Sequence, residues 1–413
     1  MTILEQAAQA KAASYSMMNL SSSLKDDALK KMADALEHNA DYILEQNEKD
    51  LAKGRESGLS DALLDRLRLT KLRISAMAEG LRKIAALPDP LGSEDYVIKR
   101  PNGLAIGKRR VPLGVIGIIY EARPNVTSDA IGLCIKSSNA MLLRGGSEAI
   151  NSNIAVADTV SKAAYEAGLP EGSIQFIRDT SREGAIELMR LSGYIDVLIP
   201  RGGQALIKSV VKNATVPVIE TGIGNCHTYL DDSAAPDMAR EIALNAKVTR
   251  PSVCNAMETL LVHEEFAKAH LKEIADALKE HGVALRGCKR SLELAHGIEE
   301  ASEEDWTCEY YDLILAVKVV NNLDEAIDHI NKYGTKHSEC IVTKDYEAAE
   351  RFLNEVDAAV VYVNASTRFT DGEEFGFGAE IGISTQKLHA RGPMGLFELT
   401  SVKYVVRGNG QIR

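Results

Sequence analysis

Short apolar runs alternate with helix-length segments through most of this sequence of 413 residues, and this alternation constrains the fold more than any other feature. Apolar runs separated by amphipathic helices are typical of βαβ units, in which parallel strands are buried on both faces. The runs form two series, at 115–120, 140–143, 174–177, 195–199 and 218–219, then at 258–262, 313–320, 340–342 and 360–363. The sequence therefore predicts an α/β protein with two Rossmann-like parallel sheets and a boundary near residues 221–232.

Residues 96–111 predict a β-hairpin that belongs to neither sheet. Asn102-Gly103 stands between two alternating segments, and Asn-Gly favours the tight turn of a hairpin. Both arms end in charged residues, so we expect the hairpin to project from the core. A late strand is predicted at 401–406, and the hairpin and this tail together suggest strand pairing between subunits.

The charge balance excludes one class of function. Lys and Arg total 48 against 59 for Asp and Glu, a formal net charge of −11, so the chain lacks the basic surface of a nucleic-acid-binding protein. No apolar run approaches the roughly 20 residues of a membrane span, and the first residues have no signal-peptide pattern. Six cysteines lie far apart, without the C-x-x-C spacing of a zinc or redox site. We expect a cytoplasmic protein with reduced thiols and no metal.

Glycine-rich loops follow two of the predicted strands, at the carboxyl ends where open parallel sheets bind ligands. Arg144-Gly145-Gly146-Ser147 follows the run at 140–143, and Arg201-Gly202-Gly203 follows the run at 195–199. Each loop leads into a helix, whose N-terminus could bind a phosphate. No carboxylate is expected in the turn to oppose Arg144, which favours the 2′-phosphate of NADP over the 2′-hydroxyl of NAD. An ordinary glycine-rich turn is the alternative for either loop.

Asn125 follows the first predicted strand of the first series. Its side-chain amide could donate a hydrogen bond into a cleft at the end of that strand. The alternative is that Asn125 and Thr127 cap the helix that follows, a role that suits both residue types.

Cys254 is the candidate nucleophile. It lies in a loop between a helix and the strand from residue 258, and Lys247 and Arg250 give it the electropositive surroundings that lower the pKa of a thiol. Cys226 is the rival, because it follows a glycine-rich loop and precedes His227. A cysteine is more often a small core residue than a catalyst, which is the alternative for each of them.

Taken together, these segments resemble the aldehyde dehydrogenase superfamily over essentially the whole chain. The segments that carry the resemblance are 110–127, 198–203, 250–255, 361–372 and 384–395. The resemblance implies that Cys254 is the nucleophile and that Asn125 donates to the oxyanion. Glu220 falls at the general-base position of hydrolytic members, but Thr221-Gly222-Ile223 follows it in place of the usual Leu-Gly-Gly. This departure argues against water activation by Glu220.

The resemblance also implies the cofactor NADP(H). Arg144 takes the place of a lysine that meets the adenosine ribose, and Ser147 takes a place often held by Glu in NAD-preferring relatives. The residues expected to bind the cofactor are Arg144, Gly145, Gly146, Ser147, Arg201, Gly202, Gly203, Glu220 and Glu309, the last of these at the nicotinamide ribose.

Within the superfamily, segments 361–372 and 384–395 are similar to enzymes that reduce the acyl phosphate of glutamate. This similarity implies NADPH-dependent reduction of L-glutamate 5-phosphate to L-glutamate 5-semialdehyde in L-proline biosynthesis, with release of phosphate and a thioester on the nucleophile. The residues expected to bind the substrate are Arg123, Arg250, Asn255, Arg368 and Arg391. One alternative is another NAD(P)-dependent aldehyde dehydrogenase or acyl reductase of the superfamily, which should lack these two segments. The other is a non-catalytic NADP-binding protein, which needs no loop thiol.

The resemblance further implies three parts of the chain. Residues 1–95 and 113–222 would form an NADP-binding domain with N-terminal helices, 223–390 a catalytic domain, and 96–112 with 400–413 an oligomerisation element. We expect a homo-oligomer, either a dimer or a tetramer. The labile acyl phosphate could also pass directly from a glutamate 5-kinase.

Overall fold

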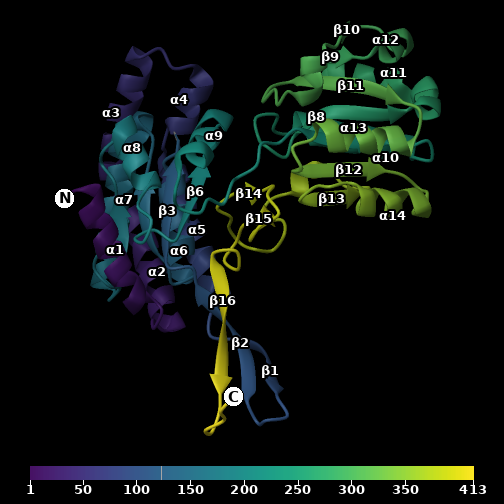
Figure 1. The fold of residues 1–413 in the computed structure, drawn as a ribbon. Coiled ribbons are helices and arrows are strands. Elements are labelled where there is room, and N and C mark those ends of the chain that lie inside the picture. The colour runs from purple at the N-terminus through teal and green to yellow at the C-terminus, as the bar shows by residue number, and fades with distance from the viewer. Residues whose placement is uncertain (122) are drawn as a thin grey trace. The chain divides into compact units, whose positions relative to one another are not determined.

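The computed structural model describes residues 1–121 and 123–413, which divide into two compact units. Unit 1 consists of Met1–Thr221, Gly376–Gly382 and Met394–Arg413, and unit 2 consists of Gly222–Phe375 and Ile383–Pro393. Each unit is built around a parallel β-sheet of its own with helices packed on it (Figure 1). No helix in the described ranges combines the length and the apolar character that a membrane crossing requires.

The sheet of unit 1 contains four strands among the described residues, in the order β5-β4-β3-β6, and all neighbours are parallel. The strands are β3 (Val115–Tyr120), β4 (Ala140–Arg144), β5 (Ile174–Phe176) and β6 (Val197–Arg201). Every residue of β3 is buried, as expected of a central parallel strand. Strands β4 and β5 add on one side of β3 and β6 returns on the other, so the strand order reverses between β3 and β6. Ligands of open parallel sheets bind at the carboxyl ends of the strands at such a reversal.

Helices cover this sheet and form the N-terminal part of unit 1, as the sequence predicts. They are α1 (Ile3–Met17), α2 (Ser22–His38), α3 (Ala40–Glu56), α4 (Asp61–Leu67), α5 (Lys71–Ala86), α6 (Asn125–Lys136), α7 (Ile150–Glu166), α8 (Arg182–Met189) and α9 (Gln204–Asn213), with the short 3₁₀ helix η1 (Ser147–Ala149). The first of them begins with a complete capping box, in which Thr2 and Glu5 bond each other's backbone.

A small antiparallel sheet, in the order β1-β2-β16, confirms the predicted hairpin and the predicted late strand. Its strands are β1 (Glu94–Lys99), β2 (Ala105–Pro112) and β16 (Thr400–Arg407). Gly103 takes a positive φ of 88° in the turn, a conformation that glycine adopts without strain. The tail strand β16 runs beside β2 of its own chain, with Thr400 opposite Pro112 (Figure 1). The tail therefore has a partner within the chain, and pairing between subunits stays a prediction.

The sheet of unit 2 has seven parallel strands within the described ranges, in the order β10-β9-β11-β8-β7-β12-β13. They are β7 (Cys226–Leu230), β8 (Met257–His263), β9 (Ala284–Gly287), β10 (Ile298–Glu300), β11 (Ile314–Val320), β12 (Ser338–Val342) and β13 (Val360–Val363). The other elements of this unit are α10 (Pro236–Val248), α11 (Glu264–Glu280), α12 (Lys289–Leu294), α13 (Leu323–Tyr333), α14 (Tyr346–Glu355), η2 (Glu303–Thr307), η3 (Thr367–Phe369), β14 (Ile383–Ser384) and β15 (Gly392–Pro393). Both predicted parallel sheets are thus confirmed.

The strand predictions fail at two kinds of place. The run at 218–219 is not a strand, because it makes only an isolated bridge between Val218 and Leu198. Strands β7, β9 and β10 were not predicted, and β7 lies inside the expected boundary. Its polar residue His227 is fully buried because the carboxylate of Glu339, on the adjacent β12, accepts hydrogen bonds from the backbone and the ring of His227. A partner so distant in sequence gives no local signal.

Candidate active site

The two glycine-rich loops lie in unit 1, at the carboxyl ends of β4 and β6, and each leads into a helix as predicted. A Cβ on Gly145 would lie 2.1 Å from the Nδ2 atom of Asn153, and a Cβ on Gly202 would lie 2.6 Å from the Cδ atom of Glu121. Only glycine fits such close contacts without displacing the neighbouring side chain. Gly203 is the N-cap residue of α9 and makes no side-chain cap, so its backbone is open to an anionic acceptor.

Glu121 is the acceptor at that position, and sequence reasoning did not single it out. It follows β3 directly, at the reversal of strand order, and its Oε2 atom accepts a hydrogen bond of 2.8 Å from the backbone N–H of Gly203. The N-terminus of a helix favours anions, and this carboxylate oxygen occupies the N-terminus of α9. An acidic residue immediately after the central strand was the available signal.

Arg144 has surroundings that differ from the prediction. Its Nη2 atom donates to the carbonyls of Thr180 and Ser181, each at 2.8 Å. Burial lowers the pKa of Arg144, while the carboxylates of Asp179 and Glu148 act in the opposite direction. The turn at 144–147 contains no carboxylate, as expected, but Glu148 follows it directly in η1 and Asp179 arrives from the loop after β5, so carboxylates do oppose Arg144 in the fold. The charge argument for NADP is correspondingly weaker.

Asn125 is the first residue of α6 and is exposed. Its Nδ2 atom donates to Asp129 at 3.0 Å and makes no cap bond to the helix, and Thr127 is buried against Tyr120, so neither residue acts as the helix cap. Burial raises the pKa of Asp129 to about 6, although the hydrogen bond from Asn125 and the charge of Arg201 oppose that rise. The second N–H of the Asn125 amide is compatible with the oxyanion role, which stays a prediction.

Cys254 lies in unit 2, in the loop between α10 and β8, as predicted. It is partly exposed, whereas its rival Cys226 is fully buried as the first residue of β7, and burial raises the pKa of the Cys226 thiol well above its usual range. Burial likewise raises the pKa of Cys340 to about 12. The thiolate is the nucleophilic form, so the geometry favours Cys254 over Cys226.

The cations around Cys254 are not those that the sequence suggested. Lys247 is fully buried and pairs with Glu258 at 2.6 Å, so its charge is balanced and it cannot supply the expected electropositive setting. Arg368 takes that place beside Arg250. The pKa of Arg368 is lowered mainly by burial and next by the charge of Arg250, while a Cys254 thiolate raises it. Arg368 therefore interacts electrostatically with both the Cys254 thiol and Arg250, which belongs to the same loop as Cys254.

The other predicted substrate residues have different surroundings. Asn255 is buried, and its Nδ2 atom donates to the carbonyls of Arg368 and Thr370, so its amide anchors the loop rather than facing a ligand. Arg391 pairs with Asp357 at 2.8 Å, and Lys336 and Lys387 bind the same carboxylate. The predicted substrate contacts of Asn255 and Arg391 are not supported by this geometry. Arg123 belongs to unit 1 and is exposed.

The two acidic residues assigned to the cofactor lie in different units. Glu309, in unit 2, accepts a hydrogen bond of 2.8 Å from the backbone N–H of Gly224, and burial raises its pKa. Glu220, in unit 1, is partly buried and precedes Thr221, whose hydroxyl donates to the carbonyl of Pro200. Within the described ranges, no three His, Cys, Asp or Glu side chains gather as metal ligands would.

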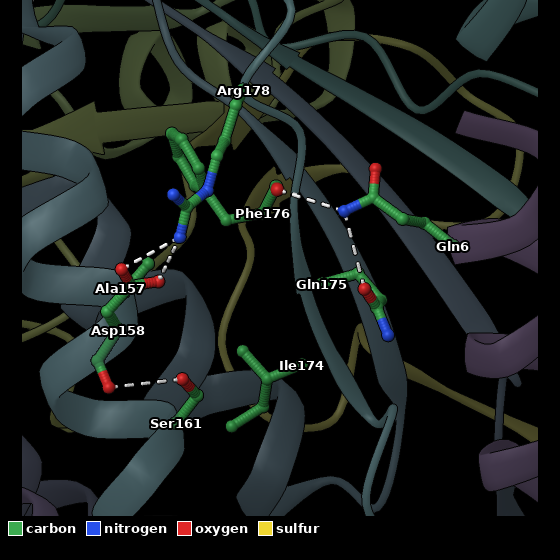
Figure 2. A pocket seen from close by; sticks show the side chains of 8 residues that line it. All are labelled: Gln6, Ala157, Asp158, Ser161, Ile174, Gln175, Phe176 and Arg178. Carbon is green, nitrogen blue, oxygen red and sulfur yellow. Dashed lines mark hydrogen bonds and ion pairs between the residues drawn. The ribbon is translucent and has the colours of Figure 1, made fainter. Parts of the chain in front are cut away.

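A cavity of about 160 Å³ lies elsewhere in unit 1, between α1, α7 and the edge strand β5 (Figure 2). Its polar groups bind one another: Gln6 donates to the carbonyl of Phe176 at 3.1 Å, and Arg178 pairs with Asp158 at 2.8 Å. None of its lining residues was predicted to act in a site. Gln6 covers the backbone of an edge strand, which otherwise invites pairing with another chain, so we interpret this cavity as structural.

Comparisons with known proteins extend these observations. The sequence pattern of the aldehyde dehydrogenase family matches residues 2–286 and 303–405. A gamma-glutamyl phosphate reductase from Clostridium perfringens is 61% identical over 405 residues, 98% of each chain, and one from Thermoanaerobacter pseudethanolicus is 59% identical over 100% of both chains. The crystal structure of gamma-glutamyl phosphate reductase from Thermotoga maritima superimposes with a TM-score of 0.98 at 49% identity and 100% coverage of both chains. The similarity thus extends along the whole sequence.

Proposed function

This chain belongs to the aldehyde dehydrogenase family, and on that premise we propose that it reduces L-glutamate 5-phosphate to L-glutamate 5-semialdehyde and releases phosphate, a step of L-proline biosynthesis. The full-length relatives at 59% and 61% identity are named for this reaction. The family uses a nicotinamide cofactor. The observation that carries the proposal is the charge around the partly exposed Cys254: Arg368 interacts with the Cys254 thiolate and with Arg250, a cation of the same loop.

The chemistry follows from these three side chains. The Cys254 thiolate attacks the acyl carbon, a carbon–sulfur bond forms, and the carbon–oxygen bond to the phosphate breaks with its electron pair leaving on phosphate. Arg250 and Arg368 repel each other, so a phosphate dianion between them is bound by both charges and relieves that repulsion. The product of this step is a thioester, and cysteine suits it because a thiolate is both a strong nucleophile and a good leaving group.

The cofactor assignment rests on the glycine-rich loops of unit 1. The residues that would hold it are those at 144–147 and 201–203. The contact between Glu121 and Gly203 supports this, because the N–H of Gly203 already donates to an anionic oxygen. NADPH supplies a hydride to the thioester carbon when it is bound. Cys254 then leaves as a thiolate, and no water activation by Glu220 is required. Preference for NADP over NAD, a role of Glu309 at the ribose and a cytoplasmic location, where thiols stay reduced, are parts of the proposal.

The decisive experiment is the reverse reaction, NADP⁺ reduction with L-glutamate 5-semialdehyde. We expect turnover only when phosphate or arsenate is present, and we expect slower turnover with NAD⁺. Phosphate-independent turnover would indicate a hydrolytic aldehyde dehydrogenase, and a chain that binds NADP⁺ without turnover would be a non-catalytic binding protein. Gel filtration of the same sample tests the expected dimer or tetramer, and coupled assays with glutamate 5-kinase test direct transfer.

Replacing Glu121 with glutamine is expected to tighten NADPH binding about threefold to tenfold. The carboxylate holds the N-terminus of α9 through Gly203, so it competes with a cofactor phosphate and repels it. The same substitution removes a favourable charge at a helix N-terminus, so the free energy of unfolding should fall by up to about 1 kcal/mol. Fluorescence titration with NADPH and thermal unfolding measure the two effects.

Glu183→Gln is the matched control for this prediction. Glu183 is an exposed acid in the first turn of α8, another helix of unit 1, so its loss should lower stability without changing the affinity for NADPH. Weaker NADPH binding by Glu121→Gln would mean that the carboxylate contacts the cofactor instead of competing with it.

A further inference from the structure

Cys226 has no part in the proposed reaction, yet its thiol contacts the backbone of the proposed nucleophile. Its Sγ atom lies 3.2 Å from the carbonyl oxygen of Cys254, within hydrogen-bond distance. A carbonyl oxygen can only accept, so the thiol is the donor. Cys226 is fully buried at the start of β7, so water does not compete for its thiol.

Gly224 fixes the same carbonyl by close packing. A Cβ built on Gly224 would lie only 1.5 Å from the carbonyl oxygen of Cys254, far inside any real contact. The chain at 224–226, where β7 begins, therefore contacts the Cys254 carbonyl in two ways: the Cys226 thiol donates to it, and Gly224 packs against it because it has no side chain.

The residue that follows the nucleophile is held from another element. The hydroxyl of Thr367, in η3, donates to the carbonyl of Asn255 at 2.7 Å, and the amide of Asn255 donates to the carbonyl of Thr370 at 2.9 Å. The peptide between Cys254 and Asn255 thus lies between two anchors. Its orientation determines the direction of the Cα–Cβ bond of Cys254, and therefore where the reactive sulfur points.

The thiol of Cys226 keeps its proton in these surroundings. Burial, then the charges of Glu339, the Cys254 thiolate and Glu309, raise its pKa, while a backbone hydrogen bond from Ser338 acts in the opposite direction. The ring Nδ1 atom of His337 lies 3.7 Å from the sulfur. A donor that stays protonated can hold the Cys254 carbonyl throughout the working pH range.

We propose that Cys226 is a positioning residue, whose thiol donates to the carbonyl of Cys254 and so orients the nucleophile for attack on the acyl carbon. This inference rests on the proposed function, because it assumes that Cys254 carries the covalent step. The role requires a small buried donor at this point. Serine keeps a donor of similar shape, and alanine removes it.

The test compares Cys226→Ala and Cys226→Ser with matched changes at Cys340. Cys340 is equally buried, lies in the neighbouring strand β12, and directs its thiol to the carbonyl of Ile341 instead of the active loop. We expect Cys226→Ala to lower kcat about fivefold to tenfold with KM changed less than twofold, because misorientation acts on the reacting geometry. The rate of Cys254 alkylation by iodoacetamide, followed by mass spectrometry of the peptide, should fall similarly. Cys226→Ser should restore most of both rates, and neither Cys340 variant should change them.

Three outcomes would overturn the inference. The first is unchanged kcat and unchanged Cys254 alkylation in Cys226→Ala. The second is an equal loss in the Cys226→Ala and Cys340→Ala variants, which would indicate a general effect of core truncation. The third outcome matters if the alanine variant does not fold. In that case, a folded Cys226→Ser variant in which Cys254 is alkylated as slowly as in the denatured chain would show that a donor at this position is not sufficient. Turnover by Cys254→Ala would instead refute the proposed function, whatever the Cys226 variants do.

Discussion

Replacing Cys254 with serine is expected to lower kcat for NADP⁺ reduction by L-glutamate 5-semialdehyde by about 10⁴-fold or more, and replacing it with alanine should abolish turnover. A serine hydroxyl is not ionised at neutral pH and leaves poorly from the tetrahedral intermediate, so it replaces the thiol in neither of its two roles. Cys254 is only partly buried, in a loop beside Arg250 and Arg368. Steady-state kinetics with phosphate present measure the loss.

Binding measurements distinguish a chemical role of Cys254 from a structural one. The glycine-rich loops belong to unit 1 and Cys254 to unit 2, so both variants should bind NADPH with wild-type affinity. Cys288→Ser is the matched control, because Cys288 is also partly exposed in unit 2 but accepts its hydrogen bond from the backbone of Val319. A Cys254→Ala variant that loses NADPH binding, or a Cys288→Ser variant that loses turnover, would contradict the assignment.

Much of the fold was predictable because buried parallel strands consist of continuous runs of apolar residues, which can be identified in the sequence. The run at 115–120 matches β3 residue for residue, and the run at 360–363 matches β13. Strand β7 was not predicted because it contains buried polar residues. One of them, His227, is paired through its Nδ1 atom with Glu339, which lies 112 residues away in the sequence. The run at 218–219 was wrongly predicted to be a strand. It is apolar, but it forms only one isolated bridge to the edge strand β6.

In the candidate site, too, features set by local sequence were predictable and features set by distant residues were not. The position of Cys254 was predictable, because a proline ends the preceding helix and an apolar run begins the next strand. The electrostatics were not predictable, because they depend on partners from distant elements. Glu258 neutralises Lys247, Asp179 approaches Arg144, and Arg368 comes from η3 to stand beside Arg250. Sequence neighbours of a reactive residue are thus poor guides to its local charge.

Replacing Arg250 with alanine is expected to raise the KM for phosphate about 100-fold in the NADP⁺-reducing direction and to lower kcat/KM for L-glutamate 5-phosphate similarly. A charge-assisted contact to phosphate is worth about 1.5–3 kcal/mol, and the leaving phosphate carries more negative charge in the transition state than in the bound substrate. Among the residues that the structure describes, Arg250 is exposed and has no ion pair. Its removal should therefore leave the stability of the protein unchanged, which makes this variant cleaner than Arg368→Ala, whose guanidinium also bonds Asn255.

Two further variants show whether the effect of Arg250 comes from phosphate recognition. Arg250→Lys keeps the charge but not the paired donors of a guanidinium, so it should recover about tenfold of the loss. Arg240→Ala is the control, because Arg240 lies on α10 of the same unit in an exposed ion pair with Glu273, and such pairs contribute little. The KM for NADP⁺ should stay constant in all three variants. An unchanged KM for phosphate in Arg250→Ala would mean that phosphate binds elsewhere. An equal rise of this KM in Arg240→Ala would mean that the effect comes only from the changed net charge of the protein.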